Sequence, residues 1–596
     1  MIKAIIDMRI ASTVVPPHPD QDSAVVTGIV LAVLSAGLTW CGSIYALRAA
    51  AWGGLLAATY RGAAPIRWTG WLARRLWENP ALIPDWAAGC LLVSAGVGGA
   101  IYFLVRSLGT IPGENHLAGT WVEKLPRNGW RAKGDGIEVV PGLRLSQAEE
   151  TQNILYLAGV GGGKTTGIMH LVQQALARGD RLLILDFKRD FTQALLAESD
   201  KPVTLIAPWD KRSARWQIGE DLSFMPPLNE FLVALIPDGR EALWAQGGRA
   251  IARVAIVSLI QERGTAWGWG DLLATCTAVL NDLQALRGAA AAYATEVLQM
   301  IDTAPGTRTS FTSNIGRALS HIAEIAGAES LIPRSRTWSV RQWREQPGAC
   351  AILGWLPESP GMSRAILLPL IESALNGLLA LPDAEPDEPE RRVWLILDEI
   401  GQVGNVPGLT SAFTSLRSRG GRIVAGIQSL SQVKKTYSPD EMTIWEGQIA
   451  TKILSRLQSR EDQDAASKMC GKQRVERFQR SLGRSSAGSS VNSNWVESER
   501  DTVRPDEFGK LGVRKNKTGV DEIIICDGQI FQAELLKRDL SISISKAAAL
   551  IKTDYLKPGF LPAPATQLGH VVDLDRFRRL APPDPNSQDT RPPHGI

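Results

Sequence analysis

Residues 154–166 read ILYLAGVGGGKTT, and these residue types suit phosphate binding. An apolar run typical of a buried strand stops at a cluster of glycines and continues as a segment of helix type. Glycines let the backbone turn tightly enough that successive N–H groups point at one anion. In this pattern we expect Lys164 to reach the β- and γ-phosphate oxygens of ATP and Thr165 to bind Mg²⁺. The predicted nucleotide-binding residues are Gly159, Gly161, Gly162, Gly163, Lys164, Thr165 and Thr166.

One position departs from the strict form of this pattern, which has a glycine five residues before Gly163. This chain has Ala158 there, with Gly159 next. Alanine fits such a corner when its φ is negative, so the departure is mild. The alternative is a tight turn without a ligand. The strand before the glycines and the Gly-Lys-Thr after them disfavour it.

A second motif lies further along the chain, where residues 393–399 read VWLILDE. The apolar run predicts a buried strand that carries two carboxylates at its end. We expect Asp398 to hold the magnesium ion and Glu399 to align the water that attacks the γ-phosphate. As an alternative, either carboxylate alone would cap the end of the strand.

Length and composition limit the class of protein. The chain has 596 residues and a formal net charge of +4, so it lacks the strongly basic surface of a passive nucleic-acid coat. Its six cysteines are scattered without a CxxC pair, which argues against a zinc site or a disulfide framework. The main body is therefore expected in the cytoplasm.

Two uncharged stretches, residues 24–47 and 86–105, are each long enough to cross a membrane. Two transmembrane helices are the simplest interpretation, and buried helices of a soluble domain are the alternative. The segment between them, residues 48–85, has five arginines and two acidic residues, so it favours the cytoplasm. This conflicts with a cytoplasmic ATPase on the same side as the N-terminus, unless one stretch is a re-entrant or interfacial helix.

The remaining chain alternates strands and helices, which predicts an α/β fold with a mainly parallel sheet covered on both faces. A long stretch, residues 228–341, has helical spacing and no convincing strand. Residues 481–493 are predicted to form a polar loop. The expected domains are a cytoplasmic segment 1–23, a membrane anchor 24–107, a linker 108–135, a nucleotide-binding domain 136–261 and 331–550, an all-α insertion 262–330, and a Pro-rich flexible tail 551–596.

Several ordered blocks resemble one family, the type IV secretion coupling proteins of the TraD/TraG kind. The resemblance covers about residues 136–540. It rests on GIEVVPGLRLSQAEETQNILYLAG, LILDFKRDF, APWDKRSARWQIGEDL, TWSVRQW, DEIGQVGNVPGL, RIVAGIQSLSQVKKTY and VRPDEFGKLG. It implies a RecA-like P-loop ATPase domain in a homo-hexamer anchored in the bacterial inner membrane, with the bulk of the chain in the cytoplasm.

The resemblance also implies roles for residues outside the two motifs. Gln428 would sit beside the γ-phosphate, and an arginine from the neighbouring subunit would stabilise the transition state. Among Arg417, Arg419 and Arg422 we choose Arg417, so the predicted catalytic residues are Lys164, Glu399, Gln428 and Arg417. Basic side chains would line the DNA channel, with an ordinary solvated face as the alternative. The candidates are Lys434, Lys435, Arg474, Arg477, Arg480 and Arg484.

The leading hypothesis is a coupling protein that uses ATP and Mg²⁺ to pump DNA into a type IV secretion channel. Its expected partners are single- or double-stranded DNA, the relaxase and relaxosome proteins, the channel components and the membrane. One alternative is a DNA translocase of the FtsK type. Another is a membrane-bound adaptor that recruits protein effectors and uses nucleotide only to assemble. An ABC transporter is excluded because no LSGGQ-like signature precedes the second motif.

Overall fold

A computed structural model describes residues 115–574 except 126–133, 199–200, 223–224, 239–241, 283–293, 296, 299–304, 486–487, 537–547, 561–562 and 564. The predicted transmembrane pair, residues 24–47 and 86–105, lies outside the described residues. The chain forms two units. One comprises residues 1–119 and 473–500, and the other residues 120–472 and 501–596.

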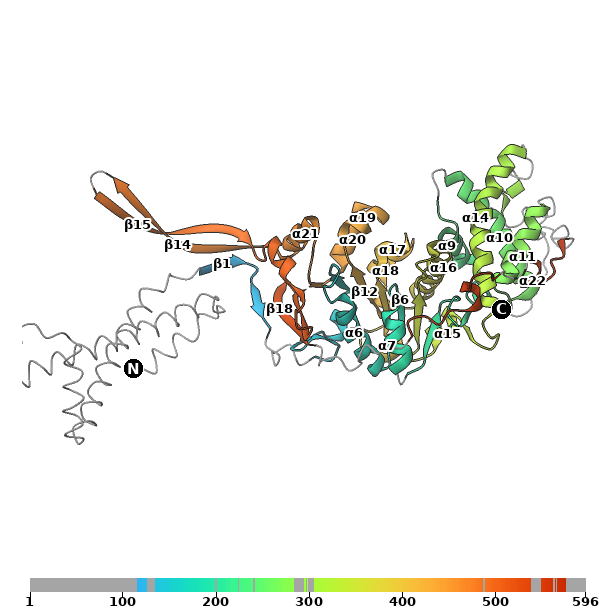
Figure 1. Ribbon diagram of the computed structural model, residues 1–596, viewed down its shortest axis with the longest axis horizontal. Coiled ribbons are helices and arrows are strands. Elements are labelled where there is room, and N and C mark those ends of the chain that lie inside the picture. Colours follow the sequence, from blue (N-terminus) through green and yellow to red (C-terminus); the bar gives the residue numbers. More distant parts are fainter. Residues whose placement is uncertain are drawn as a thin grey trace, which may run out of the picture. The chain divides into compact units, whose positions relative to one another are not determined.

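The larger unit is built on one eleven-stranded sheet with the order β2-β18-β17-β13-β5-β12-β11-β6-β10-β7, and β16 pairs with β17 at its side (Figure 1). The seven strands from β13 to β7 are parallel, whereas β17 runs antiparallel to β13 and β18. Their bounds are β2 Val122–Lys124, β5 Ile154–Leu157, β6 Arg181–Asp186, β7 Val203–Ile206, β10 Cys350–Gly354, β11 Val393–Asp398, β12 Gly421–Ile427, β13 Thr451–Leu454, β16 Gly512–Val513, β17 Gly519–Cys526 and β18 Gln529–Leu536.

Helices cover both faces of this sheet, as right-handed crossovers between parallel strands require (Figure 1). The connections from β5 to β6 and from β6 to β7 put α6 and α7 on one face, and the connections back toward β13 put α16 to α20 on the other. The bounds are α6 Lys164–Arg178, α7 Asp190–Glu198, α15 Val340–Glu345, α16 Pro360–Leu379, α17 Ile400–Val403, α18 Leu409–Ser415, α19 Leu430–Thr436, α20 Pro439–Gln448 and α21 Arg460–Cys470.

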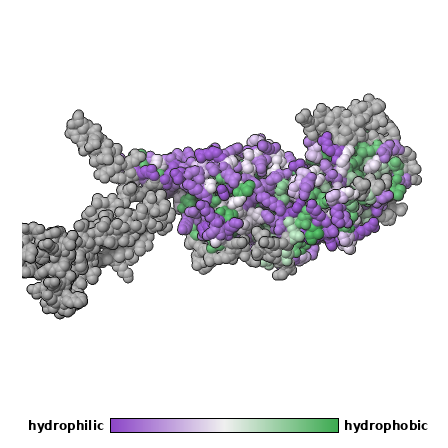
Figure 2. Space-filling view, viewed as in Figure 1, coloured by the Kyte–Doolittle hydropathy of each residue, from purple (hydrophilic) through white to green (hydrophobic). Residues whose placement is uncertain are grey.

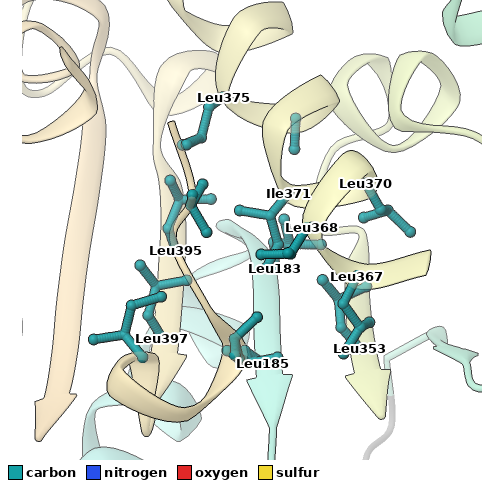
Figure 3. Close-up of a cluster of buried hydrophobic side chains, with 14 of the residues drawn as sticks. Leu183, Leu185, Leu353, Leu367, Leu368, Leu370, Ile371, Leu375, Leu395 and Leu397 are labelled. Atoms are coloured by element: carbon teal, nitrogen blue, oxygen red, sulfur yellow. The ribbon is translucent and has the colours of Figure 1, made fainter. Parts of the chain in front are cut away.

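The core lies between the parallel strands and α16. Figure 3 shows leucines of β6, β10 and β11 meeting leucines and Ile371 of this helix. Leu183, Leu185, Leu353 and Leu395 are each at most 1% exposed. Burying one such side chain contributes about 1.5–3 kcal/mol to the free energy of folding. The packing of these leucines therefore holds in place the strands that carry the site.

Strands buried on both faces are built mainly from apolar residues, and β5, β6, β11 and β12 contain no exposed residue. The buried strands predicted before the glycine-rich turn and before Asp398 are therefore confirmed. Smaller elements flank it: β3 Glu138–Val140 pairs with β4 Leu143–Arg144, and β8 Arg215–Trp216 pairs with β9 Thr337–Trp338. The remaining short helices are α5 Gln147–Glu150, α8 Ile218–Asp221, η4 Pro389–Arg391, η5 Arg417–Arg419, η6 Pro505–Lys510 and η8 Asp554–Leu556.

Where the structure describes it, the segment between β8 and β9 is mainly helical, as its apolar spacing predicts, although β9 itself lies within the range 228–341, in which no strand was expected. It contains α9 Met225–Leu235, α10 Ala242–Arg263, α11 Trp269–Asn281 and α14 Pro305–Ser330. Helices α10, α11 and α14 pack on one another beyond the β7 end of the sheet (Figure 1). Figure 2 shows a mostly hydrophilic surface over the sheet domain, with more hydrophobic residues toward α10 and α11.

The smaller unit contains a three-stranded sheet in the order β1-β14-β15, formed by Asn115–Gly119, Lys472–Ser485 and Gly488–Asp501. The polar loop predicted at residues 481–493 is therefore wrong, because strands occupy most of it. Residues 494–500 are all exposed. A strand segment without a buried side chain needs no apolar alternation, so residues 494–500 lack the usual strand signal.

The first part of the Pro-rich tail is docked on the larger unit. Lys552 pairs with Asp210 in an isolated bridge, and α22, Ala565–Leu568, packs on α11. His570 Nδ1 lies 3.1 Å from the Asp271 carboxylate. Within the described residues a single helix, α16, has the length and apolarity to span a membrane, and 78% of its apolar window is buried inside the protein.

Candidate functional site

The glycine-rich turn connects β5 to α6, as the sequence predicts. Gly161 and Gly163 have φ values of 75° and 89°, a region that side chains with a Cβ rarely adopt. A Cβ on Gly163 would also lie 2.6 Å from a methyl group of Val520. Ala158 is not among the residues with positive φ, and its N–H donates to Ile427 O at 3.0 Å. Alanine is therefore compatible with this corner.

Lys164, the first residue of α6, lies directly against the two carboxylates at the end of β11. Its Nζ donates to Glu399 Oε2 at 2.6 Å and forms an ion pair with Asp398 Oδ1 at 2.7 Å. All three side chains are nearly fully buried. The two sequence motifs, more than 200 residues apart, therefore meet in direct contact at one site.

Strand order explains this meeting. The strand β12 lies between β5 and β11, and all three are parallel, so their carboxyl ends share one edge of the sheet. Gln428 follows the last residue of β12 and therefore stands between the glycine-rich turn and the acid pair. Glu399 has a φ of 63°, an uncommon value for a residue with a side chain, and its N–H donates to Gly426 O at 3.0 Å.

The oxygens around Thr165 fit a magnesium ion. Thr165 follows Lys164, Asp398 contacts Lys164, and Asp190 at the start of α7 hydrogen-bonds the Thr165 side chain. Hydroxyl and carboxylate oxygens are the ligands that Mg²⁺ prefers, and one or two carboxylates suffice when substrate phosphates complete the shell. Among the described residues, no group of three or more His, Cys, Asp or Glu side chains forms a metal site by itself.

Two aspartates beside this site were not predicted from the sequence. Burial raises the pKa of Asp186, at the end of β6, to about 6, and Thr192 hydrogen bonds oppose this rise. Burial also raises the pKa of Asp190. Asp398 contributes to both shifts because neighbouring negative charges disfavour ionisation. The LILDFKRDF block contained both residues, but its sequence alone did not indicate which side chains face the site.

The three arginines considered for the transition state have different environments. Arg422 is fully buried, and its Nε donates to Glu150 Oε2 at 2.8 Å. Arg419 donates to the carbonyl oxygens of Leu381 and Ser415. Arg417 is exposed and makes no side-chain hydrogen bond or ion pair within the described part of the chain. Of the three guanidinium groups, that of Arg417 is thus available to a neighbouring molecule.

Arg417 does not lie at the edge that carries Lys164. It belongs to η5, directly before β12, whereas Gln428 directly follows β12. The seven residues of β12 separate these two edges by roughly 20 Å at about 3.3 Å per residue. An arginine side chain is much shorter than this, so Arg417 does not reach Lys164 of its own chain.

A buried ionic network at that opposite edge was missed by the sequence analysis. Glu150 accepts two hydrogen bonds from Arg178, at 2.9 and 2.8 Å, as well as the one from Arg422. The Ile137 N–H donates to the same carboxylate at 2.6 Å. The neighbouring Glu149 instead forms a capping box with Ser146. Glu150 therefore stabilises the sheet and takes no part in nucleotide chemistry.

The basic residues considered for a DNA channel are partly paired. Lys434 contacts Glu461 at 3.2 Å, and Arg474 contacts Glu497 at 2.9 Å. Lys435 is exposed. The side chains of Arg480 and Arg484 lie outside the described residues, so channel lining stays a prediction.

Comparison with known proteins decides the family. The family model described as type IV secretion-system coupling protein DNA-binding domain matches residues 138–522. The chain belongs to this family. The curated coupling protein TraD of Escherichia coli (strain K12) is 27% identical over 305 residues, which cover 50% of this chain and 40% of that protein. The match therefore spans less than half of the length of TraD.

Solved structures of TrwB share the fold. The unbound bacterial conjugative coupling protein TrwBdeltaN70 has a TM-score of 0.57 at 20% identity, covering 74% of this chain and 99% of that one. TrwB in complex with the non-hydrolysable ATP analogue ADPNP has a TM-score of 0.56 at 21% identity, covering 75% and 99%. The predicted mainly parallel α/β fold is thus confirmed for this chain.

Proposed function

We propose that this coupling protein hydrolyses ATP to move DNA into a type IV secretion channel. The single observation that carries the proposal is Lys164 held between Asp398 and Glu399 at the end of a glycine-rich turn. The ADPNP complex of TrwB and the description of the matching family as a DNA-binding domain support the nucleotide and the cargo.

The chemistry follows from the buried charges of the site. When a nucleotide binds, its phosphate oxygens replace the two carboxylates as partners of Lys164. The Glu399 carboxylate is then free to orient a water molecule in line with the γ-phosphate. A magnesium ion held by Thr165 and Asp398 would neutralise charge on the phosphates.

Gln428 provides a link from the site to the rest of the motor. Because Gln428 directly follows β12, its amide is the group proposed to contact the γ-phosphate, and α19 begins two residues later, at Leu430. Loss of the γ-phosphate would remove this contact and let α19 shift. Lys435 lies on the same helix, so such a shift would move a basic side chain that can contact DNA phosphates without reading sequence.

The proposal extends to assembly and location. Arg417 lies on the edge opposite Lys164 of its own chain, so as the proposed catalytic arginine it would serve the site of a neighbouring subunit. This arrangement supports a ring such as a homo-hexamer. The uncharged stretches 24–47 and 86–105 support an anchor in the bacterial inner membrane. Relaxase proteins and channel components are the proposed partners. The domain boundaries also stay as proposed from the sequence, with 136–261 and 331–550 forming the motor and 262–330 the helical insertion.

The test is ATP turnover by the full chain with and without single-stranded DNA. We expect DNA to stimulate turnover, the stimulation to fall with rising salt, and Lys164→Ala to abolish it. Lys557→Ala, at an exposed lysine paired with Asp554, is the matched control and should behave as wild type. Nucleotide-dependent assembly without any turnover would refute the pump and favour a recruiting adaptor.

A further inference from the structure

The glycine-rich turn is held from its outer side by a second segment, which we name the loop brace: residues 455–458 after β13 together with residues 512–513. The strand β13 pairs in parallel with β5, so the brace leaves the sheet at the same edge as the turn. Four hydrogen bonds join the two. They are Gly159 N–H to Arg456 O at 2.7 Å, Ser455 Oγ–H to Gly162 O at 2.6 Å, Gln458 Nε2–H to Val160 O at 3.3 Å, and Val513 N–H to Gly161 O at 3.4 Å.

These contacts fix the direction in which the turn presents its backbone. Three successive carbonyl oxygens, those of residues 160 to 162, accept hydrogen bonds from the brace. In a planar trans peptide the N–H points opposite to its C=O. The N–H groups of the same peptides are therefore directed away from the brace. That of Gly162 donates to Gly159 O at 3.0 Å within the turn, so we expect those of Gly161 and Gly163 to face a phosphate.

Arg456 is placed differently from the other brace residues. Its carbonyl oxygen faces the turn, whereas its side chain is exposed beside it. A Cβ added to Gly512 would lie 2.7 Å from the Cβ of Arg456 and 3.2 Å from the Cα of Gly162, so Gly512 packs between the two residues. Within the part of the chain that the structure describes, the Arg456 guanidinium has no hydrogen bond, ion pair or ring contact. An unpaired cation thus stands next to the phosphate-binding turn.

The strand order indicates which part of a bound nucleotide would lie near the Arg456 guanidinium. The strands β12 and β11 lie on one side of β5. They carry the residues proposed to contact the γ-phosphate, which are Gln428, Asp398 and Glu399. On the other side lies β13 with Arg456. A triphosphate whose γ end faces β11 directs its α-phosphate and ribose toward β13.

We propose that Arg456 binds the α-phosphate and ribose end of the nucleotide and sets the affinity for ATP and ADP alike, without acting in hydrolysis. This inference rests on the proposed ATPase function. It adds a binding residue that neither sequence motif contains. A guanidinium contributes charge-assisted hydrogen bonds to a phosphate, so its loss should weaken binding roughly tenfold.

Binding titrations of the full chain test this role, with ADP and a non-hydrolysable ATP analogue as the probes. Arg456→Ala should weaken both by about the same factor of roughly ten, and Arg456→Lys should restore part of it because it keeps the charge. Turnover at saturating ATP should stay near the wild-type value. Arg460→Ala is the matched control, since Arg460 is an exposed arginine four residues further on, at the start of α21, where it pairs with Asp464.

The possible results separate this inference from the proposed function. Equal affinity of wild type and Arg456→Ala for both nucleotides would overturn the role of Arg456 and leave the ATPase intact. Weakened binding of the ATP analogue alone would also overturn it, because the contact would then be to the γ-phosphate. Wild-type protein that binds neither nucleotide would refute the ATPase and, with it, this inference. An unchanged melting temperature of Arg456→Ala would verify that the exposed side chain is not needed for folding.

Discussion

Arg417 offers the sharpest test of how the site is completed. The residue is exposed, and β12 separates it by roughly 20 Å from the edge that carries Lys164 in its own chain. We therefore expect Arg417 to act on the nucleotide of a neighbouring subunit. Arg417→Ala should lower turnover by roughly 10³-fold or more, as is usual for such arginines, while nucleotide binding and the melting temperature stay unchanged.

Mixing two inactive variants distinguishes action within one chain from action between chains. Lys164→Ala lacks a working nucleotide site but still supplies Arg417 to a neighbour. Arg417→Ala keeps Lys164 but cannot supply the arginine. In rings assembled from an equal mixture, half of the subunits keep Lys164 and half of their neighbours keep Arg417. About a quarter of the sites are then complete, so turnover should recover to roughly a quarter of the wild-type rate.

The assay is steady-state ATP hydrolysis with saturating DNA, after the two variants have been mixed and allowed to exchange subunits. Arg419→Ala is the control, because Arg419 caps carbonyl groups of its own chain and should retain turnover in the folded protein. Turnover by Arg417→Ala within tenfold of wild type would refute the assignment. A mixture that stays inactive would refute action between subunits.

Two further predictions concern stability. Glu150→Ala leaves the buried guanidinium of Arg422 without its carboxylate and should cost about 3–5 kcal/mol, measured by chemical denaturation, whereas Glu149→Ala removes only a helix cap and should cost about 1 kcal/mol. Equal losses in the two variants would contradict the network. Burial raises the pKa of Glu329 from 4.5 to about 8, so the stability from its neutral form is complete below pH 4.5 and is lost as pH rises through 8. Glu329→Gln should therefore gain melting temperature over wild type as pH rises from 5 to 9, and a constant difference would refute this.

The residue sequence by itself determined the elements whose signals are local. Apolar runs predict β5, β6, β11 and β12, because a strand buried on both faces has few polar positions. The glycines before Lys164 and the acid pair after an apolar strand indicate nucleotide chemistry, because each motif is complete within a few residues. Helical spacing also predicts the α10, α11 and α14 region, although its boundaries as a domain stay a prediction.

The tertiary structure decided which residues meet. The sequence does not distinguish three arginines that lie within six positions. In the structure Arg422 is buried against Glu150, because both residues lie at the amino edge of the sheet, whereas Arg417 is exposed. Arg456 lies far along the chain from Lys164, and only the pairing of β13 with β5 brings it to the phosphate turn. Strand order is set by long-range packing, so contacts that depend on it carry no local signal in the sequence.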